Sequence, residues 1–451
     1  MTASITRGRT AFAFDSGALL AKARKLGCDQ AEVYETGVVT TPVNFENNHL
    51  KSVETAETAV VAVRVLKNGR VGFATSSRAG DEGVVDMAVR ASEFGPEATF
   101  EFAAPSPVPK GLALYDETVA DWPQEKMLAV GQEIVDHVRS LEDGVLGGAM
   151  VEKYIGYTRV ATSSGQEVCA DGTAYLALAS AELVEPDNMI QVWRYSASRR
   201  LDLDVGAMKA DLTRLYRHSR HNVPFRGGRY PVIFAPLAGA DLISPMMACV
   251  DGMAVVKGES PWRERTGEKL FADHFSLYDD PSLPWGIRTT PFDDEGTPTT
   301  RRPVIEKGVL RGFLLDLRSG KALGQGSTGN GYRQVPQSLP APRASNVVAE
   351  PGATPLADLI GGIKEGVFVE RLMGAWAGNP YAGQVSGNVH IGFKIENGEI
   401  VGRVKDCMVT VNVFEAFRDS LLALSRETQS APPAAVLPYI LLDAVSVSTK
   451  A

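Results

Sequence analysis

Two apolar runs joined by Lys-Asn-Gly-Arg at 67–70 give residues 60–74 the strongest local structural signal in the sequence. Asn-Gly favours a two-residue hairpin turn, because both central positions of that turn take a positive φ. Residues 145–204 alternate strongly between apolar and polar side chains, with turn-forming residues at 163–165 and 171–172. This alternation predicts about four half-buried strands, so antiparallel sheet must dominate the first half of the fold.

Helical spacing of apolar residues interrupts these strands. Residues 16–25 predict a helix with Asp15 or Ser16 as its N-cap and Gly27 as its terminator. Further predicted helices, with their expected buried stripes, are 81–94 (Val84, Met87, Ala88, Ala91, Phe94), a helix capped by Asp121 (Met127, Val130, Ile134, Val138, Leu141), 207–217, 237–257 and 413–424. Shorter alternating runs predict strands at 31–36, 43–47, 50–55, 230–235 and 439–447.

Two breaks in the pattern divide the chain. A Pro-rich stretch at 103–109 resembles a linker, and a basic connector at 214–229 marks the main domain boundary. The predicted units are 1–110, an N-terminal helix and sheet subdomain; 111–225, a second α/β subdomain; and 226–451, a β-rich C-terminal domain. The expected fold class is therefore α+β, with antiparallel sheets and helices in a two-part N-terminal region.

Composition excludes several classes of protein. The 46 Lys and Arg against 54 Asp and Glu give a net charge of −8, which argues against direct nucleic-acid binding. The four cysteines are scattered without a CxxC pair, so a Cys-rich zinc module is excluded and a reducing compartment is expected. No apolar run is long enough for a signal peptide or a membrane span. We expect a cytoplasmic protein that does not enter the membrane.

A glycine-rich loop at 324–329 matches GxGxxG, the dinucleotide-binding pattern. That pattern works only where the glycines lead into a helix whose N-terminus faces the pyrophosphate, and here Pro336, Pro340 and Pro342 follow instead. Ser327 lies in the same loop, but Gln325 breaks the GxSxG elbow of a serine hydrolase and no histidine has a recognisable partner pattern. The loop is predicted to be flexible, with access to a peptide backbone.

Three consecutive carboxylates at 293–295 form a dense acidic turn. Oxygen ligands in this number suit Ca²⁺ or Mg²⁺, although the EF-hand spacing is absent. The more common alternatives for such a run are an exposed turn, a helix cap or ion pairs with Arg301 and Arg302. His218 and His221 lie three residues apart, but Arg217 and Arg220 flank them and would repel a cation.

Several motifs in order resemble the TldD/PmbA family, also called modulators of DNA gyrase. Residues 292–333 read FDDEGTPTTRRPVIEKGVLRGFLLDLRSGKALGQGSTGNGYR, which is similar to the family's DDEG turn, its strand pair and its stGn..R loop. The hairpin at 60–75, the opening strand at 227–236, the hairpin at 391–400 and the late segment at 411–424 also resemble family motifs. The resemblance spans nearly the whole chain and implies a TldD/PmbA-type C-terminal domain.

The resemblance implies one of two kinds of subunit. TldD-type subunits carry HExxxH on the helix after the opening strand, with a later cysteine as a further ligand, and act as metalloproteases on extended or unfolded peptides. This sequence contains no HExxxH, and no cysteine follows Cys407. If the loop at 260–262 keeps its family position, the motif's slot is Ile243, Ser244, Pro245, Met246, Met247 and Ala248. The two imidazoles of the motif are missing there, and a proline in a helix interior costs about 3 kcal/mol.

The resemblance therefore implies a PmbA/TldE-like subunit with no catalytic residue and no metal or other cofactor of its own. Its partner would be a TldD-type, HExxxH-bearing subunit that holds zinc in a heterodimer, while this chain shapes the chamber for a peptide substrate. The candidate peptide-binding residues are Asp293, Asp294, Glu295, Gly326, Ser327, Thr328, Gly329, Asn330 and Arg333; structural turns are the equal alternative. A second hypothesis is a stand-alone, homodimeric peptide-binding or regulatory protein. A third is an enzyme that uses the acidic turn and a bound cation.

Overall fold

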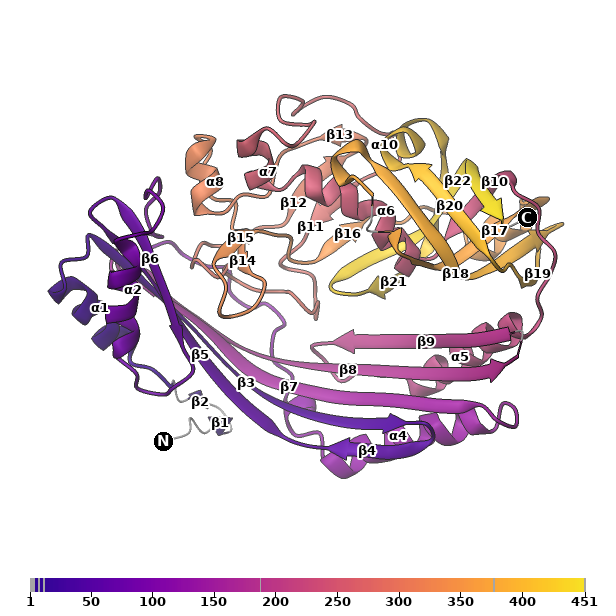
Figure 1. Ribbon diagram of the computed structural model, residues 1–451, viewed down its shortest axis with the longest axis horizontal. Helices are drawn as coiled ribbons and strands as arrows, with labels where there is room; N and C mark the ends of the chain where they lie inside the picture. Colours follow the sequence, from indigo (N-terminus) through magenta and orange to yellow (C-terminus); the bar gives the residue numbers. More distant parts are fainter. Residues whose placement is uncertain (1–4, 7–8, 11–12, 187, 376–377, 450–451) are drawn as a thin grey trace.

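The computed structural model describes residues 5–6, 9–10, 13–186, 188–375 and 378–449. Its N-terminal part is built on a long curved sheet, and its C-terminal part lies above the last strand of that sheet in the view of Figure 1. Helices and strands are mixed without regular alternation, which confirms the predicted α+β class.

Seven described strands form the N-terminal sheet in the order β6-β5-β3-β7-β8-β9, with β4 beside β3, and every pairing is antiparallel. The strands are β3 (Gln30–Glu46), β4 (His49–Val53), β5 (Ala56–Lys67), β6 (Arg70–Ser76), β7 (Leu146–Thr162), β8 (Glu167–Glu185) and β9 (Asn188–Ser198). Near the N-terminus, β1 (Ile5–Thr6) pairs with β2 (Arg9–Thr10). Strands on both sides of residue 110 share this one sheet, so the two predicted N-terminal subdomains are joined by a continuous hydrogen-bonded ladder.

One face of this sheet is covered by helices. These are α1 (Ser16–Lys25), α2 (Gly83–Ser92), α4 (Gln124–Arg139) and α5 (Val205–Arg220), while the short α3 (Glu117–Ala120) precedes α4. Val43, Val151 and Val192 project from the sheet into the same apolar core as Ile134 of α4 and Leu212 of α5. Because side chains alternate between the faces of a strand, their sequence neighbours project to the opposite, helix-free face.

Local signals predicted several of these elements. Asn68 and Gly69 take φ values of 49° and 72°, so the hairpin between β5 and β6 has the predicted two-residue turn. Asp15 caps α1 as predicted, since its side chain accepts a hydrogen bond from the backbone of Ala18 at 3.0 Å. Pro123, with no side-chain hydrogen bond, precedes α4 in place of the predicted cap Asp121, which ends α3 instead.

Other expectations are corrected. The alternating region contains three strands rather than about four, because the predicted turn at 171–172 lies inside β8 and only the one at 163–165 separates strands. The runs 31–36 and 43–47 belong to the single strand β3. Met87 of α2 and Phe94, two residues past the end of α2, are 40% and 89% exposed rather than buried. Pairing with long neighbouring strands overrides the local turn signals in β3 and β8.

The C-terminal part contains a mixed sheet of eleven described strands in the order β10-β17-β18-β20-β22-β16-β11-β12-β13, with β19 on β18 and β21 on β22. They are β10 (Gly228–Phe234), β11 (Leu277–Asp279), β12 (Arg302–Glu306), β13 (Val309–Leu310), β16 (Val347–Ala349), β17 (Glu365–Met373), β18 (Gln384–Glu396), β19 (Glu399–Arg403), β20 (Cys407–Asn412), β21 (Leu421–Ala431) and β22 (Ala435–Thr449). A separate pair joins β14 (Gly331–Arg333) to β15 (Pro340–Pro342).

Short helices complete this part: α6 (Pro236–Cys249), α7 (Gly252–Lys257), α8 (Leu317–Ala322), α9 (Leu356–Gly361), η2 (Pro380–Ala382), α10 (Val413–Glu415) and the single π-turn η3 (Ala416–Ser420). The predicted late helix at 413–424 therefore ends at 420, and residues 421–424 begin β21 because they pair with β22. Opposite faces of β10 pack on α6 and on α5: Phe234 lies in a core with Leu242, and Ile233 in a core with Leu215. No helix among the described residues is long and apolar enough to cross a membrane.

Candidate functional site

Four buried charged side chains join the N-terminal sheet to the C-terminal part. Arg64 of β5 donates from Nε to Oε1 of Glu32 at 2.8 Å and from Nη1 to Oε1 of Glu295 at 2.9 Å. Arg333 of β14 donates from Nη2 to the same Glu32 oxygen at 3.1 Å. None of the four side chains is more than 4% exposed. Glu32, Arg64, Glu295 and Arg333 are named the interdomain ion cluster below.

Aromatic rings line this cluster. The Arg64 guanidinium lies 5.0 Å from the ring centre of Phe102, and that of Arg333 lies 4.6 Å from the ring centre of Tyr34. Cation–π contacts and paired carboxylates together offset the cost of removing two guanidinium groups from water. The sequence carried a signal for this site, because Arg64 interrupts an otherwise apolar strand and therefore needs a buried partner.

The acidic turn is built into the same junction. Oδ1 of Asp293 accepts hydrogen bonds from the backbone N–H groups of Glu295 and Thr297 at 3.0 and 2.9 Å, and Oδ2 accepts one from Gly331 at 2.8 Å. Asp293 is fully buried. The alternative of an exposed turn is therefore wrong: the carboxylate organises its own turn and ties it to β14.

Its two neighbours are bonded in the same way. Asp294 accepts from the backbone N–H of Arg333 at 2.7 Å, and Oε2 of Glu295 accepts from that of Leu317, the first residue of α8, at 2.7 Å. The suggested pairs with Arg301 and Arg302 are absent from the described contacts, since Arg301 pairs with Asp280 at 3.2 Å and Arg302 donates to a backbone carbonyl.

Burial dominates the protonation behaviour of this turn. It raises the pKa of Asp294 to about 6 and that of Glu295 to about 7, although Arg64 opposes the second shift. Burial and the neighbouring Glu295 also raise the pKa of Asp293. Burial therefore moves the pKa values of Asp294 and Glu295 toward neutral pH.

The glycine-rich loop is held to the same region. The Ser327 and Thr328 hydroxyls each donate to the carbonyl of Leu315 at 3.1 Å, and Thr328 accepts from the backbone N–H of Leu315 at 2.7 Å. Nδ2 of Asn330 donates to Asp279 at 2.6 Å. Gly329 packs so closely on Pro298 that a Cβ there would lie 2.5 Å from a backbone oxygen.

The predicted peptide-binding residues are thus close together, but most of their polar groups bond the protein itself. Gly326 is the exposed member of the set, and Gly329, Asn330 and Arg333 are buried. Their hydrogen bonds hold the acidic turn, β14 and α8 together and connect them to the N-terminal sheet. A role in peptide binding stays a prediction for them.

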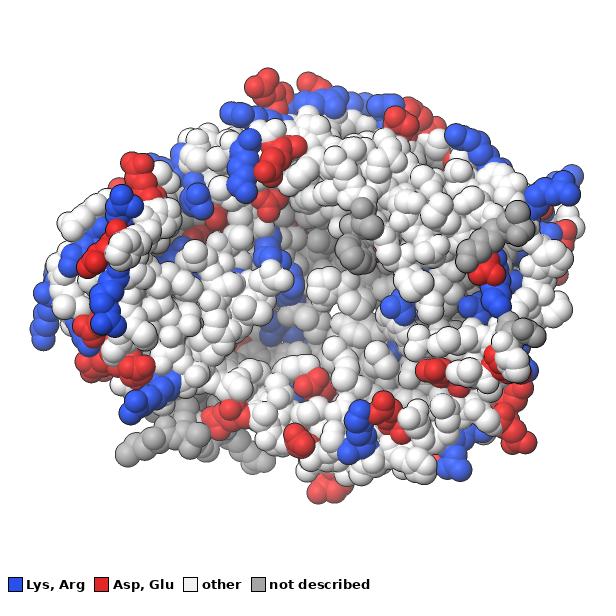
Figure 2. Space-filling view, in the orientation of Figure 1, with Lys and Arg blue, Asp and Glu red and all other residues white. Residues whose placement is uncertain are grey.

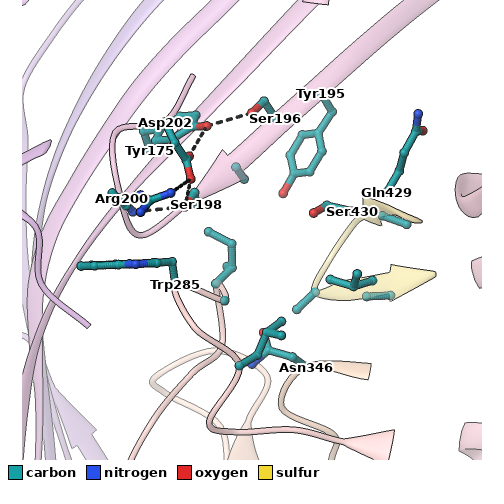
Figure 3. Close-up of a pocket in the computed structure, with 18 of the residues that line it drawn as sticks. Tyr175, Tyr195, Ser196, Ser198, Arg200, Asp202, Trp285, Asn346, Gln429 and Ser430 are labelled. Carbon is teal, nitrogen blue, oxygen red and sulfur yellow. Dashed lines mark hydrogen bonds and ion pairs between the residues drawn. The ribbon is translucent and has the colours of Figure 1, made fainter. Parts of the chain in front are cut away.

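A cleft lies between β9 and the C-terminal part, apart from the predicted peptide-binding residues. Figure 2 shows the hollow between these two parts, and the cleft has a volume of about 970 Å³. Its walls come from β9, from the loop at 283–287 and from the hairpin that joins β21 to β22. Figure 3 shows Tyr195 projecting into it, opposite the hairpin that carries Gln429 and Ser430.

Polar contacts fix the floor of this cleft. The Tyr175 hydroxyl bonds Ser196 at 2.9 Å and Asp202 at 3.1 Å, and Arg200 pairs with Asp202 at 3.3 Å (Figure 3). The sequence did not reveal this site. Its walls lie far apart along the chain, and only the tertiary fold brings them together.

The wall at β9 is an edge of the N-terminal sheet, because only β8 pairs with β9 among the described strands. In an antiparallel strand, alternate residues direct both backbone groups away from the neighbouring strand. The carbonyls of Met189 and Trp193 accept hydrogen bonds from arginine side chains, and the N–H of Arg199 donates to the carbonyl of Trp285 at 3.1 Å. These bonds show that the backbone groups of odd-numbered residues point away from β8. Tyr195 and Ala197 follow the same alternation, so their N–H and C=O groups face the cleft.

Comparison with known proteins shows which family has this architecture. Residues 227–449 match the family model described as PmbA/TldA metallopeptidase C-terminal domain, and residues 31–93 match the model described as PmbA/TldA metallopeptidase domain 1. The chain belongs to the PmbA/TldD family. The β-rich C-terminal domain of the family thus begins at the strand predicted to open it.

Relatives of similar length agree with the assignment to the PmbA/TldD family. A protein of Archaeoglobus fulgidus named metalloprotease is 25% identical over 408 residues, which cover 87% of this chain and 91% of its own. One from Methanothermobacter thermautotrophicus with the same name is 24% identical over 84% of each chain. The crystal structure of TldE from Thermococcus kodakarensis has the same fold, with a TM-score of 0.89 at 24% identity over 96% of this chain and 99% of its own.

Because the family models are described as metallopeptidase domains, residues 243–248, where the resemblance places HExxxH, were compared with the ligands that zinc requires. Residues 243–248 lie in α6, the helix directly after β10, where the resemblance placed the motif. Ile243, Pro245 and Met246 are buried in the apolar core, Ser244 is exposed, and Met247 and Ala248 are half-buried. None of these side chains offers the imidazole or carboxylate that zinc takes as a ligand, so the slot does not fit this metal.

Pro245 lies inside α6, which continues through it. Asp241 lies one turn earlier on α6 and is half-buried; burial raises the pKa of its carboxyl to about 6, against the opposing effect of Arg371. Asp241 is a single carboxylate, and among the residues that the structure describes no three His, Cys, Asp or Glu side chains group into a metal site.

Proposed function

We propose that this chain is the subunit without a zinc site in a two-subunit metalloprotease of the TldD/TldE type. The proposal rests chiefly on the composition of α6 at residues 243–248, where the family resemblance places HExxxH. The helix is retained there, but it presents Ser244 and the half-buried Met247 instead of ligands. A TldD-type partner that carries HExxxH would then supply the zinc and the activated water.

The contribution of this chain would be to hold the substrate. Tyr195 and Ala197 direct backbone groups that pair with no other described strand into a cleft of about 970 Å³. An extended or unfolded peptide bonds such an edge through its main chain, which accepts many sequences. Two parts of the chain, locked together by the interdomain ion cluster, would keep the cleft open at a fixed width.

The test is co-expression with an HExxxH-bearing TldD-type subunit, followed by zinc analysis and digestion of an unfolded peptide. We expect a stable complex with zinc in the partner and cleavage that chelators abolish. The lone chain should bind the peptide without cleaving it. A partner with its motif Glu changed to Gln is the matched control, because it should assemble equally well and cleave nothing.

Two results would refute the proposal. One zinc ion per chain with chelator-sensitive cleavage by the lone protein would assign the catalytic metal to this chain. Absence of any complex, combined with peptide binding by a stable homodimer, would favour the stand-alone peptide-binding protein.

A further inference from the structure

A second, smaller hollow lies on the helix-free face of the N-terminal sheet. Its volume is about 250 Å³, and its walls come from β3, β7, β8 and the segment 287–290 of the C-terminal part. Gly156 and Gly172 lie directly opposite each other on β7 and β8. Because neither has a side chain, the sheet forms a bare floor at this point.

The Arg199 guanidinium occupies the space over that floor. A Cβ on Gly172 would lie 2.4 Å from Nη1 of Arg199, so a side chain at 172 would displace the guanidinium. Nε donates to the carbonyl of Gly286 at 3.0 Å and Nη1 to that of Leu114 at 3.4 Å. Nη2 donates to none of the described residues.

No carboxylate among the described residues forms an ion pair with this guanidinium. Burial lowers the pKa of Arg199 to about 10, and no neighbouring charge opposes that effect. Arg64, Arg194 and Arg333, which are also largely buried, each pair with a carboxylate, whereas the buried Arg403 donates to the backbone carbonyls of Met189 and His390. A largely desolvated cation without a counter-ion is unfavourable, which makes an external anion a favourable partner.

The remaining polar groups of the hollow leave this role to Arg199. Four of the five threonines in the wall donate their hydroxyl to a backbone carbonyl at 2.6–3.0 Å, namely Thr36, Thr173, Thr289 and Thr290. The fifth, Thr158, has a side-chain hydrogen bond with Tyr34. Asp171 is the carboxylate in the wall. It directly precedes Gly172 on β8, so its side chain projects to the opposite face of the sheet from Arg199.

We propose that this hollow binds a carboxylate of the peptide held by the protein, with Arg199 as its cationic partner. The inference rests on the proposed function, because a peptide is the source of the anion. Guanidinium groups bind carboxylates through charge-assisted hydrogen bonds, which are stronger than bonds between neutral groups. The carboxylate is that of a C-terminus or of an Asp or Glu side chain, and the experiment separates the two.

The first probe is N-acetylglycine, with N-acetylglycinamide as its uncharged match, titrated by NMR against the full chain. We expect the acid to bind and the amide to bind at least about tenfold more weakly, as a charged hydrogen bond implies. Arg199→Gln should reduce acid binding to the level of the amide. Arg139→Gln, at an exposed position on α4, makes the same charge change and should leave binding unaltered.

The second probe is a set of three unfolded peptides: one with a free C-terminus, one amidated with an internal Glu, and one amidated with Gln in its place. Tighter binding of the first identifies a C-terminal carboxylate, and tighter binding of the second an acidic side chain. Equal affinity of all three, or equal binding of acid and amide probes to the native chain, would overturn the carboxylate site while leaving the proposed function intact. N-acetylglycine binding without any peptide binding would instead refute the proposed function. The native chain answers these questions even if Arg199→Gln fails to fold.

Discussion

Removal of the Arg64 charge is the most direct test of the interdomain ion cluster. Arg64→Met keeps most of the length and apolar surface of the side chain but removes both ion pairs. Glu32 retains Arg333 as a partner at 3.1 Å, whereas Glu295 loses its cation while it remains 1% exposed. The variant therefore leaves one buried carboxylate uncompensated.

The expected loss of stability follows from that burial. Breaking a buried pair by removing one partner costs about 3–5 kcal/mol. For a unit of about 150–250 residues this lowers the melting temperature by roughly 6–20 °C. Arg220→Met is the matched control, because Arg220 pairs with Glu142 and Glu185 but is 31% exposed. Exposed pairs contribute about 1 kcal/mol or less.

Urea unfolding and calorimetry of the native chain and both variants measure the difference. The penalty of Arg64→Met should shrink between pH 7 and pH 5, since Glu295 has a pKa near 7 and becomes neutral. If the Arg64 and Arg220 variants differ by less than about 1 kcal/mol, the cluster does not stabilise the junction and the reasoning from burial fails.

Three further predictions test other parts of the molecule. The pKa of Glu295 is raised from 4.5 to about 7 on folding, so the folded state binds more protons than the unfolded state between these pH values. The free energy of unfolding should therefore fall as pH rises from 4.5 to about 7. Urea titrations at several pH values should show a weaker pH dependence of this free energy in Glu295→Gln. Gly95→Ala places a Cβ 1.8 Å from the backbone oxygen of Val71 and should cost about 1–3 kcal/mol of unfolding free energy, whereas Gly312→Ala, with open space around it, should cost far less. Ala197→Pro removes an outward N–H of β9 and should weaken peptide binding about fivefold in a polarisation assay, while Ala197→Gly keeps that N–H; equal affinities would argue against the β9 edge as the binding site.

Much of the local structure could be predicted because its causes are local. The Asn68-Gly69 turn needs positive φ values that few other pairs adopt, and Asp15 caps its helix through its own backbone neighbours. The opening strand β10 and the helix α6 were located from their apolar runs and the family resemblance. The missing ligands at 243–248 were visible for the same reason, since side-chain chemistry is a property of the sequence.

The candidate site was predicted only in part. The residues at 293–295 and 326–333 do lie together, but the sequence offered an exposed acidic turn and a flexible loop, whereas Asp293 and Asn330 are buried and bonded. Glu295 and Arg333 bond Arg64 and Glu32, which are more than 200 residues away along the chain. No local pattern specifies a contact at that separation.

The sequence by itself determined the alternation that makes long antiparallel strands, the turns and caps, and the absence of zinc ligands at residues 243–248. The tertiary structure alone decided which charges became buried, that 171–172 lies within β8, and that residues 421–424 join a strand. Among the residues that the structure describes, it also left β9 paired on one side only and Arg199 without an ion pair. Those properties depend on which distant segments exclude water from a side chain or pair with a backbone, and the free energy of both is fixed only when the whole chain has folded.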